Sequence, residues 1–253
     1  PSNQGMLDAI EIAAPRASML NAAFPAAVAG RANTCQRVID VVLGALASAL
    51  PDRAVGAANG ANTMVVFSGT DPQTGKDYVY LETVGGGFGG RATRDGKDGV
   101  QVHLINTSNL PVEAIETEYP LLVEAYEFVE NSGGAGQHRG GLGLRRTIRP
   151  VDHTAVFTGQ GERFLNAPWG IFGGAEGGKG CFYLKTPEGR AALPTKPGLT
   201  AVRPDQAVTV ETAGAGGYGP PDARRQAEVE ADLASGKYTR DYVRAHYSKF
   251  KEA

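Results

Sequence analysis

Residues 80–109 read YLETVGGGFGGRATRDGKDGVQVHLINTSN. The stretch starts inside a predicted strand, Tyr78–Val84, and continues as a glycine-rich, charged loop over Gly85–Gly99. A second strand is expected over Val100–Ile105. Because glycine lacks a Cβ atom, successive glycines permit left-handed conformations and close backbone approaches that other residues exclude. This arrangement predicts a β protein with long, glycine-rich connections.

The remaining sequence extends the same pattern. Glycine accounts for 35 of the 253 residues, about twice its ordinary share of roughly 7%. Further strands are predicted at Ile10–Ile12, Thr63–Ser68, Leu122–Val129, Leu144–Arg149, Thr154–Thr158, Cys181–Lys185 and Val208–Thr212. The turn signals between them favour an antiparallel sandwich or a barrel-like module.

One strong helix is predicted over residues 33–50. Asn33 is expected to cap its start, Gln36 to complete a capping box, and Pro51 to end the helix. Apolar residues recur at helical spacing and predict a face packed on the core. These residues are Val38, Val41, Val42, Leu46 and Ala49.

The tail predicts two shorter helices, Ala223–Ser235 with Asp222 as cap, and Thr239–Lys251. The expected fold class is therefore α+β: mainly antiparallel β, sandwich or barrel-like, with one buried helix near 33–50 and C-terminal helices. We expect three parts. They are a helix with a glycine-rich strand-loop region (1–120), a β-rich module (121–220) and a helical tail (221–253).

Composition excludes several classes of function. The net charge of −2 gives no footprint for nucleic acid or an anionic membrane. No apolar run approaches the roughly 18–20 residues that span a bilayer. Cys35 and Cys181 lie far apart, which favours a reducing compartment, and a cytoplasmic location is expected. The start at Pro1, without a methionine, indicates the middle of a longer chain.

Most standard catalytic motifs are absent. The sequence has no GxxxxGK[ST] loop, no GxSxG and no HExxH, and its four histidines are scattered. GGGFGG is not a dinucleotide fingerprint, because a strand rather than a helix is expected after it. No metal site is predicted in this chain.

Three stretches remain as candidates for chemistry. Glu82 and the glycines Gly85, Gly86 and Gly87 suit a backbone that offers free N–H groups to an anion, or equally a wide turn. After the next expected strand come His103, Asn106, Thr107, Asn109, Glu113 and Glu116, which either line a site, with a glutamate as base, or satisfy a local turn. Of the two, the interpretation as a local turn is favoured.

The third stretch carries the arginines 139, 145, 146 and 149. A guanidinium fork suits a carboxylate or phosphate, but such a run of arginines more often decorates a β-hairpin and pairs with acidic residues on the surface. Cys35 and Trp169 are interpreted as packing residues.

Taken together, these motifs resemble the C-terminal half of a hydantoinase B/5-oxoprolinase family subunit. The resemblance covers about residues 15–221. It rests on SMLNAAFPAAVAGRANTCQRVIDVVLGAL (18–46), the 80–121 region ending in NLPVEAIETEYPL, NSGGAGQHRGGLGLRR (131–146), APWGIFGG (167–174) and VETAGAGGYGPP (210–221).

The resemblance implies part of the B-type subunit of an ATP-dependent cyclic amide hydrolase. The alternatives are part of an ATP-dependent ketone carboxylase of the acetone or acetophenone type, and a noncatalytic scaffold module. The resemblance further implies a hetero-oligomer with a hydantoinase A-type subunit that binds ATP and Mg and phosphorylates the substrate. The family's divalent metal lies in the N-terminal half of the B-type polypeptide, so no cofactor is expected on this chain.

Within that resemblance, the residues expected nearest the active site follow from the first two stretches. Glu82, His103, Asn106 and Glu113 are the catalytic candidates. Gly85, Gly86, Gly87, Thr107 and Asn109 are the candidates for substrate contact.

Overall fold

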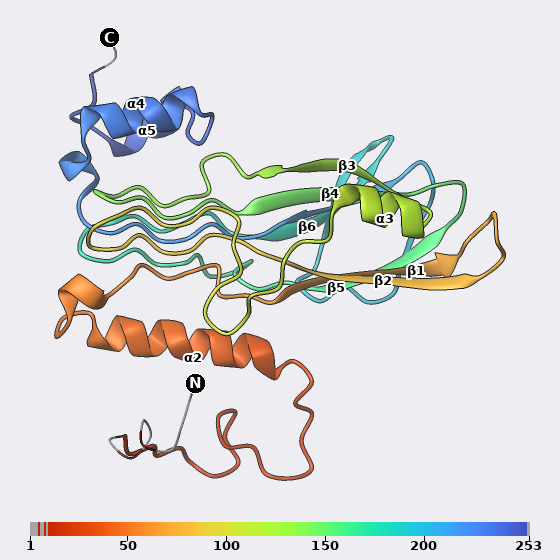
Figure 1. Cartoon of the computed structure of the whole chain (residues 1–253), viewed down its shortest axis with the longest axis horizontal. Coiled ribbons are helices and arrows are strands. Elements are labelled where there is room, and N and C mark those ends of the chain that lie inside the picture. The colour runs from red at the N-terminus through yellow and green to blue at the C-terminus, as the bar shows by residue number, and fades with distance from the viewer. Residues whose placement is uncertain (1–4, 6–7, 9, 252–253) are drawn as a thin grey trace.

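The computed structural model describes Gly5, Asp8 and residues 10–251, and contains two antiparallel sheets (Figure 1). The first sheet has the order β2-β1-β5-β8 and the second the order β3-β4-β9-β6-β7. The first consists of β1 (Thr63–Thr70), β2 (Asp77–Val84), β5 (Ala155–Gln160) and β8 (Thr200–Val202). The second consists of β3 (Leu121–Phe128), β4 (Leu144–Pro150), β6 (Cys181–Thr186), β7 (Gly189–Leu193) and β9 (Ala207–Glu211).

One apolar core lies between the two sheets. β1 alternates between buried and partly buried residues, as expected when one face of a strand meets a core. Phe157 of β5 packs on Phe67 of β1 with ring centroids 5.2 Å apart, and on Phe182 of β6 at 6.0 Å. The short helix α3 (Val112–Glu118) adds Ile115 to this core. Of the two predicted architectures, a sandwich and a barrel-like module, the two sheets form the sandwich.

Most strand predictions are confirmed, and two are wrong. Ile10–Ile12 forms no strand. Val100–Ile105 makes one isolated bridge, between Gly86 and Val100, and then turns at His103, whose φ is +55°. Two strands were not predicted, because β7 is almost fully exposed and β8 has only three residues.

Beyond the strands, five glycine-rich segments run side by side (Figure 1). We call them the glycine bundle: residues 56–60, 85–99, 131–143, 168–180 and 213–219. The segment 213–219 exchanges hydrogen bonds with all four others: Gly216 N to Ala57 O, Gly87 N to Ala213 O, Ala215 N to Gly141 O and Gly217 N to Ala175 O, at 2.9–3.1 Å. A strand in a sheet has at most two neighbours, so this part is a bundle of extended chains.

Glycine is required in the bundle because neighbouring backbones fill the space of a side chain. A Cβ atom on Gly140 would lie 1.8 Å from the carbonyl oxygen of Ala215, and one on Gly214 would lie 1.8 Å from that of Ser132. Helices cover the bundle on opposite sides in Figure 1, with α2 on one side and α4 (Gln226–Ala234) and α5 (Arg240–His246) on the other.

The predicted long helix is present as α2 (Arg31–Leu46), but it ends four residues before the predicted Leu50. Gln36 forms no capping box, because its side chain donates to Val102 O at 3.0 Å. Gly30 is at the N-cap position, and Asn33 lies inside the helix, where its side chain accepts a hydrogen bond from Asn62 N at 2.8 Å. The helix also faces the other way: its buried residues are Asn33, Gln36 and Asp40, and the predicted core residues Val41, Val42 and Leu46 are exposed. Cys35, predicted to pack, is exposed as well.

The two C-terminal helices are confirmed, although α4 begins at Gln226 rather than after Asp222. The division at residues 120 and 220 stays a prediction, and the first sheet takes strands from both sides of residue 120. Among the described helices, none has the length and apolarity needed to cross a membrane. The expectation based on Pro1 concerns residues outside the described part.

Candidate functional site

The loop from His103 to Pro111 is fixed at both ends by a buried carboxylate. At its start, the His103 ring is held by Asp40 of α2. At its end, the backbone N–H of Leu110 donates to Glu82 Oε1 of β2 at 3.0 Å. Between these points Asn106, Thr107 and Ser108 are exposed. We call residues 103–111 the anchored loop.

The first anchor is Asp40, whose side chain has four partners. Its carboxylate accepts from Ala58 N at 3.2 Å and from Arg163 Nη2 at 2.8 Å. Its Oδ1 lies 3.0 Å from His103 Nε2, and its Oδ2 lies 3.2 Å from an Arg37 nitrogen. Both carboxylate and imidazole have only 4% of their side-chain surface exposed. Asp40 thereby joins α2, the glycine bundle and the anchored loop.

The guanidinium groups of Arg37 and Arg163 lie against the Asp40 carboxylate, and Glu162 adds a negative charge near both arginines. Burial opposes ionisation of Asp40, but the His103 hydrogen bond and the charges of Arg37 and Arg163 hold its pKa below the ordinary value. Burial, followed by the neighbouring charge of Arg163, lowers the pKa of Arg37 to about 10. Two guanidinium groups therefore share one carboxylate at this anchor.

The second anchor is Glu82, which is 5% exposed. Its Oε2 accepts hydrogen bonds from the Tyr80 hydroxyl and from Arg146 of β4. Burial, and then the hydrogen bond to Glu82, raises the pKa of Tyr80. The Arg146 guanidinium lies 4.0 Å from the ring centroid of Tyr126, and the Tyr126 hydroxyl accepts from Asn109.

The predicted catalytic residues are thus divided between different positions. Glu82 and His103 are in the two anchors, Asn106 is at the exposed centre of the loop, and Glu113 is exposed in the first turn of α3. Of the predicted substrate contacts, Thr107 is exposed and Asn109 joins the Glu82 anchor through Tyr126. The roles of all these residues stay predictions.

The predicted glycine contacts lie inside the bundle. Gly85, Gly86 and Gly87 are buried. The N–H of Gly86 donates to Val100 O at 2.9 Å, and that of Gly87 donates to Ala213 O at 3.1 Å. Because these two N–H groups already have backbone partners, the geometry favours the structural alternative for this stretch over an anion site.

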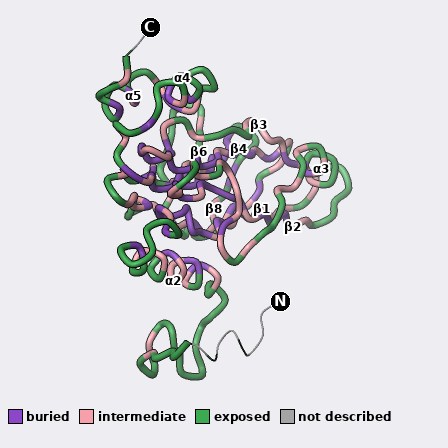
Figure 2. Tube along the Cα trace, turned by 60° about the vertical axis from the view of Figure 1, so that its left-hand side comes forward, coloured by how far each residue is buried: buried purple, intermediate pink, exposed green. Residues whose placement is uncertain are grey.

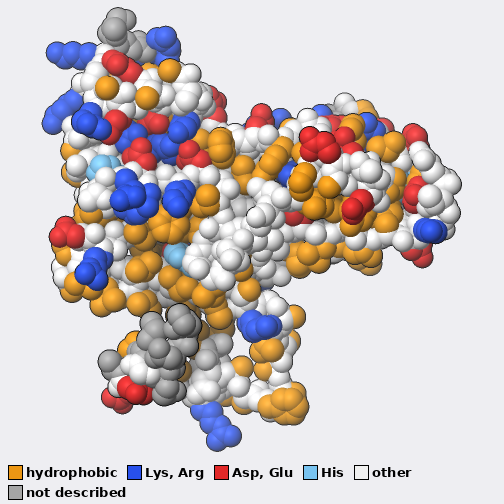
Figure 3. Space-filling view, viewed as in Figure 1, with side chains coloured by type: hydrophobic (Ala, Val, Ile, Leu, Met, Phe, Trp, Pro, Cys, Tyr) orange, Lys and Arg blue, Asp and Glu red, His pale blue; other side chains and the backbone are white. Residues whose placement is uncertain are grey.

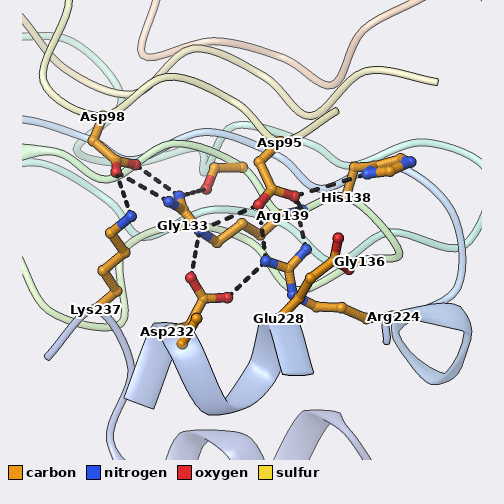
Figure 4. A network of polar contacts seen from close by, with 12 residues as sticks. Asp95, Asp98, Gly133, Gly136, His138, Arg139, Arg224, Glu228, Asp232 and Lys237 are labelled. Carbon is orange, nitrogen blue, oxygen red and sulfur yellow. Dashed lines mark hydrogen bonds and ion pairs between the residues drawn. The ribbon is translucent and has the colours of Figure 1, made fainter. Parts of the chain in front are cut away.

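The four arginines of the third stretch pair with carboxylates of the chain itself. Arg145 binds Glu127 and Glu211, Arg146 binds Glu82, and Arg149 binds Glu124. Arg139 belongs to a buried network that fixes the C-terminal helices on the glycine bundle (Figure 4). The arginines thus pair with acidic residues, as the alternative preferred from sequence has it, but Arg139 and Arg146 are buried and pair with buried carboxylates rather than surface ones.

In the Figure 4 network, carboxylates and basic groups alternate. Arg139 forms two hydrogen bonds to Asp98, at 2.7 and 3.0 Å, and one to Asp232 of α4 at 3.1 Å. Arg224 reaches Asp95 at 2.7 and 2.8 Å and Asp232 at 2.7 Å. Lys237 lies 3.3 Å from Asp98. Three carboxylates facing three basic groups indicate a structural role.

Asp40 is the polar residue that sequence reasoning missed. A charged residue inside an otherwise apolar helical pattern was the available signal, because a buried acid needs partners. Arg163 has a φ of +63° and was equally hidden in a loop. Across the described residues, no group of three or more His, Cys, Asp or Glu side chains could hold a metal ion.

Together, these features describe a module that displays a polar loop, anchored at both ends, beside a glycine bundle. The family model for hydantoinase B/oxoprolinase matches residues 1–221. The chain belongs to the hydantoinase B/oxoprolinase family, which confirms the resemblance seen in the sequence.

Individual relatives agree with this assignment. A putative D-/L-hydantoinase of the B type from Pseudomonas sp. (strain NS671) is 33% identical over 98% of this chain and 41% of its own. 5-Oxoprolinase 1 of Arabidopsis thaliana is 37% identical over 87% of this chain and 16% of its own. The crystal structure of ATP-dependent caprolactamase from Pseudomonas jessenii matches 83% of this chain and 38% of that chain, with a TM-score of 0.73 and 26% identity. The chain thus spans less than half of these relatives.

Proposed function

We propose that this chain is part of the B-type subunit of an ATP-dependent cyclic amide hydrolase of the hydantoinase, 5-oxoprolinase or lactamase type. The observation that carries the proposal is the anchored loop, in which two buried carboxylates fix the ends of a segment that exposes amide and hydroxyl groups. A backbone segment fixed at both ends loses less freedom when it binds a ligand than a free loop does. The relatives supply the class of reaction.

The proposed chemistry divides work between subunits. An unstrained amide carbonyl is a poor electrophile, and transfer of phosphate from ATP to its oxygen makes the carbon open to attack by water. The C–N bond then breaks, the ring nitrogen leaves as an amine, and a second water cleaves the resulting acyl phosphate to a carboxylate and phosphate. ATP and Mg belong to a hydantoinase A-type partner in this scheme, and a divalent metal belongs to the N-terminal half of the B-type polypeptide. The A-type partner, the N-terminal half and their hetero-oligomer with this chain are all part of the proposal. So is a cytoplasmic location, which the two free cysteines support.

Within this scheme the present chain binds and orients the substrate. The exposed Asn106 amide and Thr107 hydroxyl suit the alternating N–H and C=O groups of a cyclic amide. The exposed Glu113 is the proposed base toward the attacking water. Glu82 and His103 act at the anchors by holding the loop.

The test is steady-state kinetics of the assembled complex with ATP and hydantoin, 5-oxoproline or caprolactam. Asn106→Ala and Glu113→Gln should each lower kcat/KM by about 10²-fold or more. Glu118→Gln, an equally exposed glutamate of α3, is the matched control and should leave it unchanged. If the wild-type complex turned over ATP only with bicarbonate and a ketone, the carboxylase alternative would replace the proposal. Unchanged kinetics in Asn106→Ala would exclude the anchored loop from substrate binding, and unchanged kinetics in Glu113→Gln would exclude Glu113 as the base.

A further inference from the structure

Helix α2 has its polar and apolar faces reversed relative to an ordinary surface helix. The side facing the glycine bundle carries Asn33, Gln36 and Asp40, all at most 7% exposed. On the opposite side, Val41, Val42 and Leu46 are 67%, 49% and 46% exposed. An amphipathic helix normally buries its apolar stripe, so the stripe of α2 is placed to pack against a further surface.

The segment before α2 shows the same exposure. Residues 10–28, which we call the arm, run below α2 and are exposed almost throughout (Figures 1 and 2). Within the arm, Ile12 is 78% exposed, Met19 81% and Phe24 99%. Figure 3 shows hydrophobic side chains gathered around α2 and on the segment below it. The arm and the outward face of α2 together present one extended surface that is largely apolar, and Glu11 and Arg16 of the arm are its charged residues.

The chemistry of this surface indicates a permanent partner. No charged residue occurs between Val41 and Leu50. Monomeric proteins rarely expose apolar patches larger than about 300–600 Å², and transient interfaces are about as polar as the rest of a surface. Obligate interfaces are more apolar and resemble a domain core divided in two. An uncharged helix face of this kind suits a partner that never dissociates.

We infer that the outward face of α2 and the arm dock onto the region that longer relatives carry in the same polypeptide. This inference rests on the proposed function. The relatives supply the occupant, because this chain covers only 41% of the B-type hydantoinase and 44% of the beta chain of caprolactamase. A covalently tethered partner is present at high effective concentration, so the face needs no charged residues for solubility.

Thiol labelling tests the docking without any activity measurement. Cys35 is exposed on α2 and should react readily with a maleimide in the 253-residue chain. In the full-length polypeptide its labelling should be roughly tenfold slower or more, since reaction then requires local opening. Cys181 is the internal control: burial, and then Glu211, raises its pKa to about 12, so it should react slowly in both.

Each other outcome has a definite meaning. Equal labelling of Cys35 in both forms would overturn the inference. Protection in the 253-residue chain that disappears on dilution would identify a second copy as the occupant, and would overturn it too. A full-length polypeptide with protected Cys35 and no activity would overturn only the proposed function.

A pair of variants of the full-length polypeptide keeps the inference testable if the shorter chain does not fold. Val42→Glu should lower the melting temperature by about 5–10 °C, because it buries a charge in an apolar contact. Leu199→Glu, at a loop residue that is 84% exposed, is the matched control and should shift it by less than about 2 °C. Equal small shifts would show that the α2 face is free.

Discussion

The two sheets and the glycine bundle have interiors made of different atoms. Between the sheets, side chains such as Phe67, Phe157 and Phe182 fill the space. In the bundle, backbone atoms fill it, and the segment 213–219 exchanges hydrogen bonds with four neighbours. A core of side chains relaxes by repacking, whereas a core of backbone has no rotamers to change. We therefore expect the bundle to tolerate substitution much less well than the sandwich.

The largest effect should come from adding one methyl group to the bundle. Gly140→Ala places a Cβ atom 1.8 Å from the carbonyl oxygen of Ala215. No side chain can move aside, so the cost should exceed about 5 kcal/mol of unfolding free energy, an exceptional value for one substitution. Circular dichroism during urea denaturation of the variant measures it. Gly198→Ala, where the new Cβ meets no atom within 4 Å, is the control. Similar stability of the two variants would remove the distinction between the cores.

In the sandwich, the corresponding change is removal of a buried ring. Phe157 is 0% exposed and contacts rings on both sides. Phe157→Ala should cost about 4 kcal/mol through lost burial and the cavity left behind. Phe157→Leu should cost about 1.5 kcal/mol, because neighbouring side chains repack around a similar volume. The same denaturation measurement applies to both variants, and an equal loss in both would show that this core is as rigid as the bundle.

Sequence periodicity predicted the sandwich well because its signal is local. Alternation along β1 and the turn at Asp71–Gly75 are sufficient to define the first hairpin. The glycines of the bundle were recognised as unusual, but their hydrogen bonds join segments that lie far apart in the sequence, as Gly216 and Ala57 do, and no local pattern contains that information. The strand expected at Val100–Ile105 was wrong because the chain turns at His103, whose φ is +55°.

Helix α2 shows a second limit of sequence reasoning. Its helical spacing was correct, yet the apolar face was assigned to the core, because an amphipathic helix normally buries its apolar stripe. In the candidate site, the stretch around Asn106 was selected as a candidate from residue types alone. Of the anchor residues, Glu82 and His103 were identified as candidates, but Asp40 was missed, because it precedes His103 by 63 residues in the chain. Nothing in the sequence around either residue indicates that the other lies beside it in the fold.

Ion pairs allow a smaller test of the same comparison. Arg139 is 3% exposed and joins the bundle to α4, so Arg139→Met should leave Asp98 and Asp232 as poorly compensated buried charges. The expected loss is about 3 kcal/mol. Arg145→Met, on the sandwich, removes a partly exposed pair with Glu211 and Glu127 and should cost less than about 1 kcal/mol. Chemical denaturation distinguishes the two, and equal losses would show that the network adds nothing special to the bundle.

Lowering the pH should produce the smallest loss of stability, and one that affects the glycine bundle and α4 before the sandwich. Burial opposes ionisation of Asp95 and Asp98, but hydrogen bonds and charge from Arg224 and Arg139, respectively, lower the pKa of each below the ordinary value. A carboxylate with a depressed pKa stabilises the folded state above the unfolded pKa of about 4, and that contribution is lost as the pH falls toward the folded value. Hydrogen exchange at several pH values should therefore show α4 losing protection on acidification before β1 does. Asp98→Asn should weaken this pH dependence. Loss of protection in β1 first, or in both together, would show that the charge network does not set the acid sensitivity of the bundle.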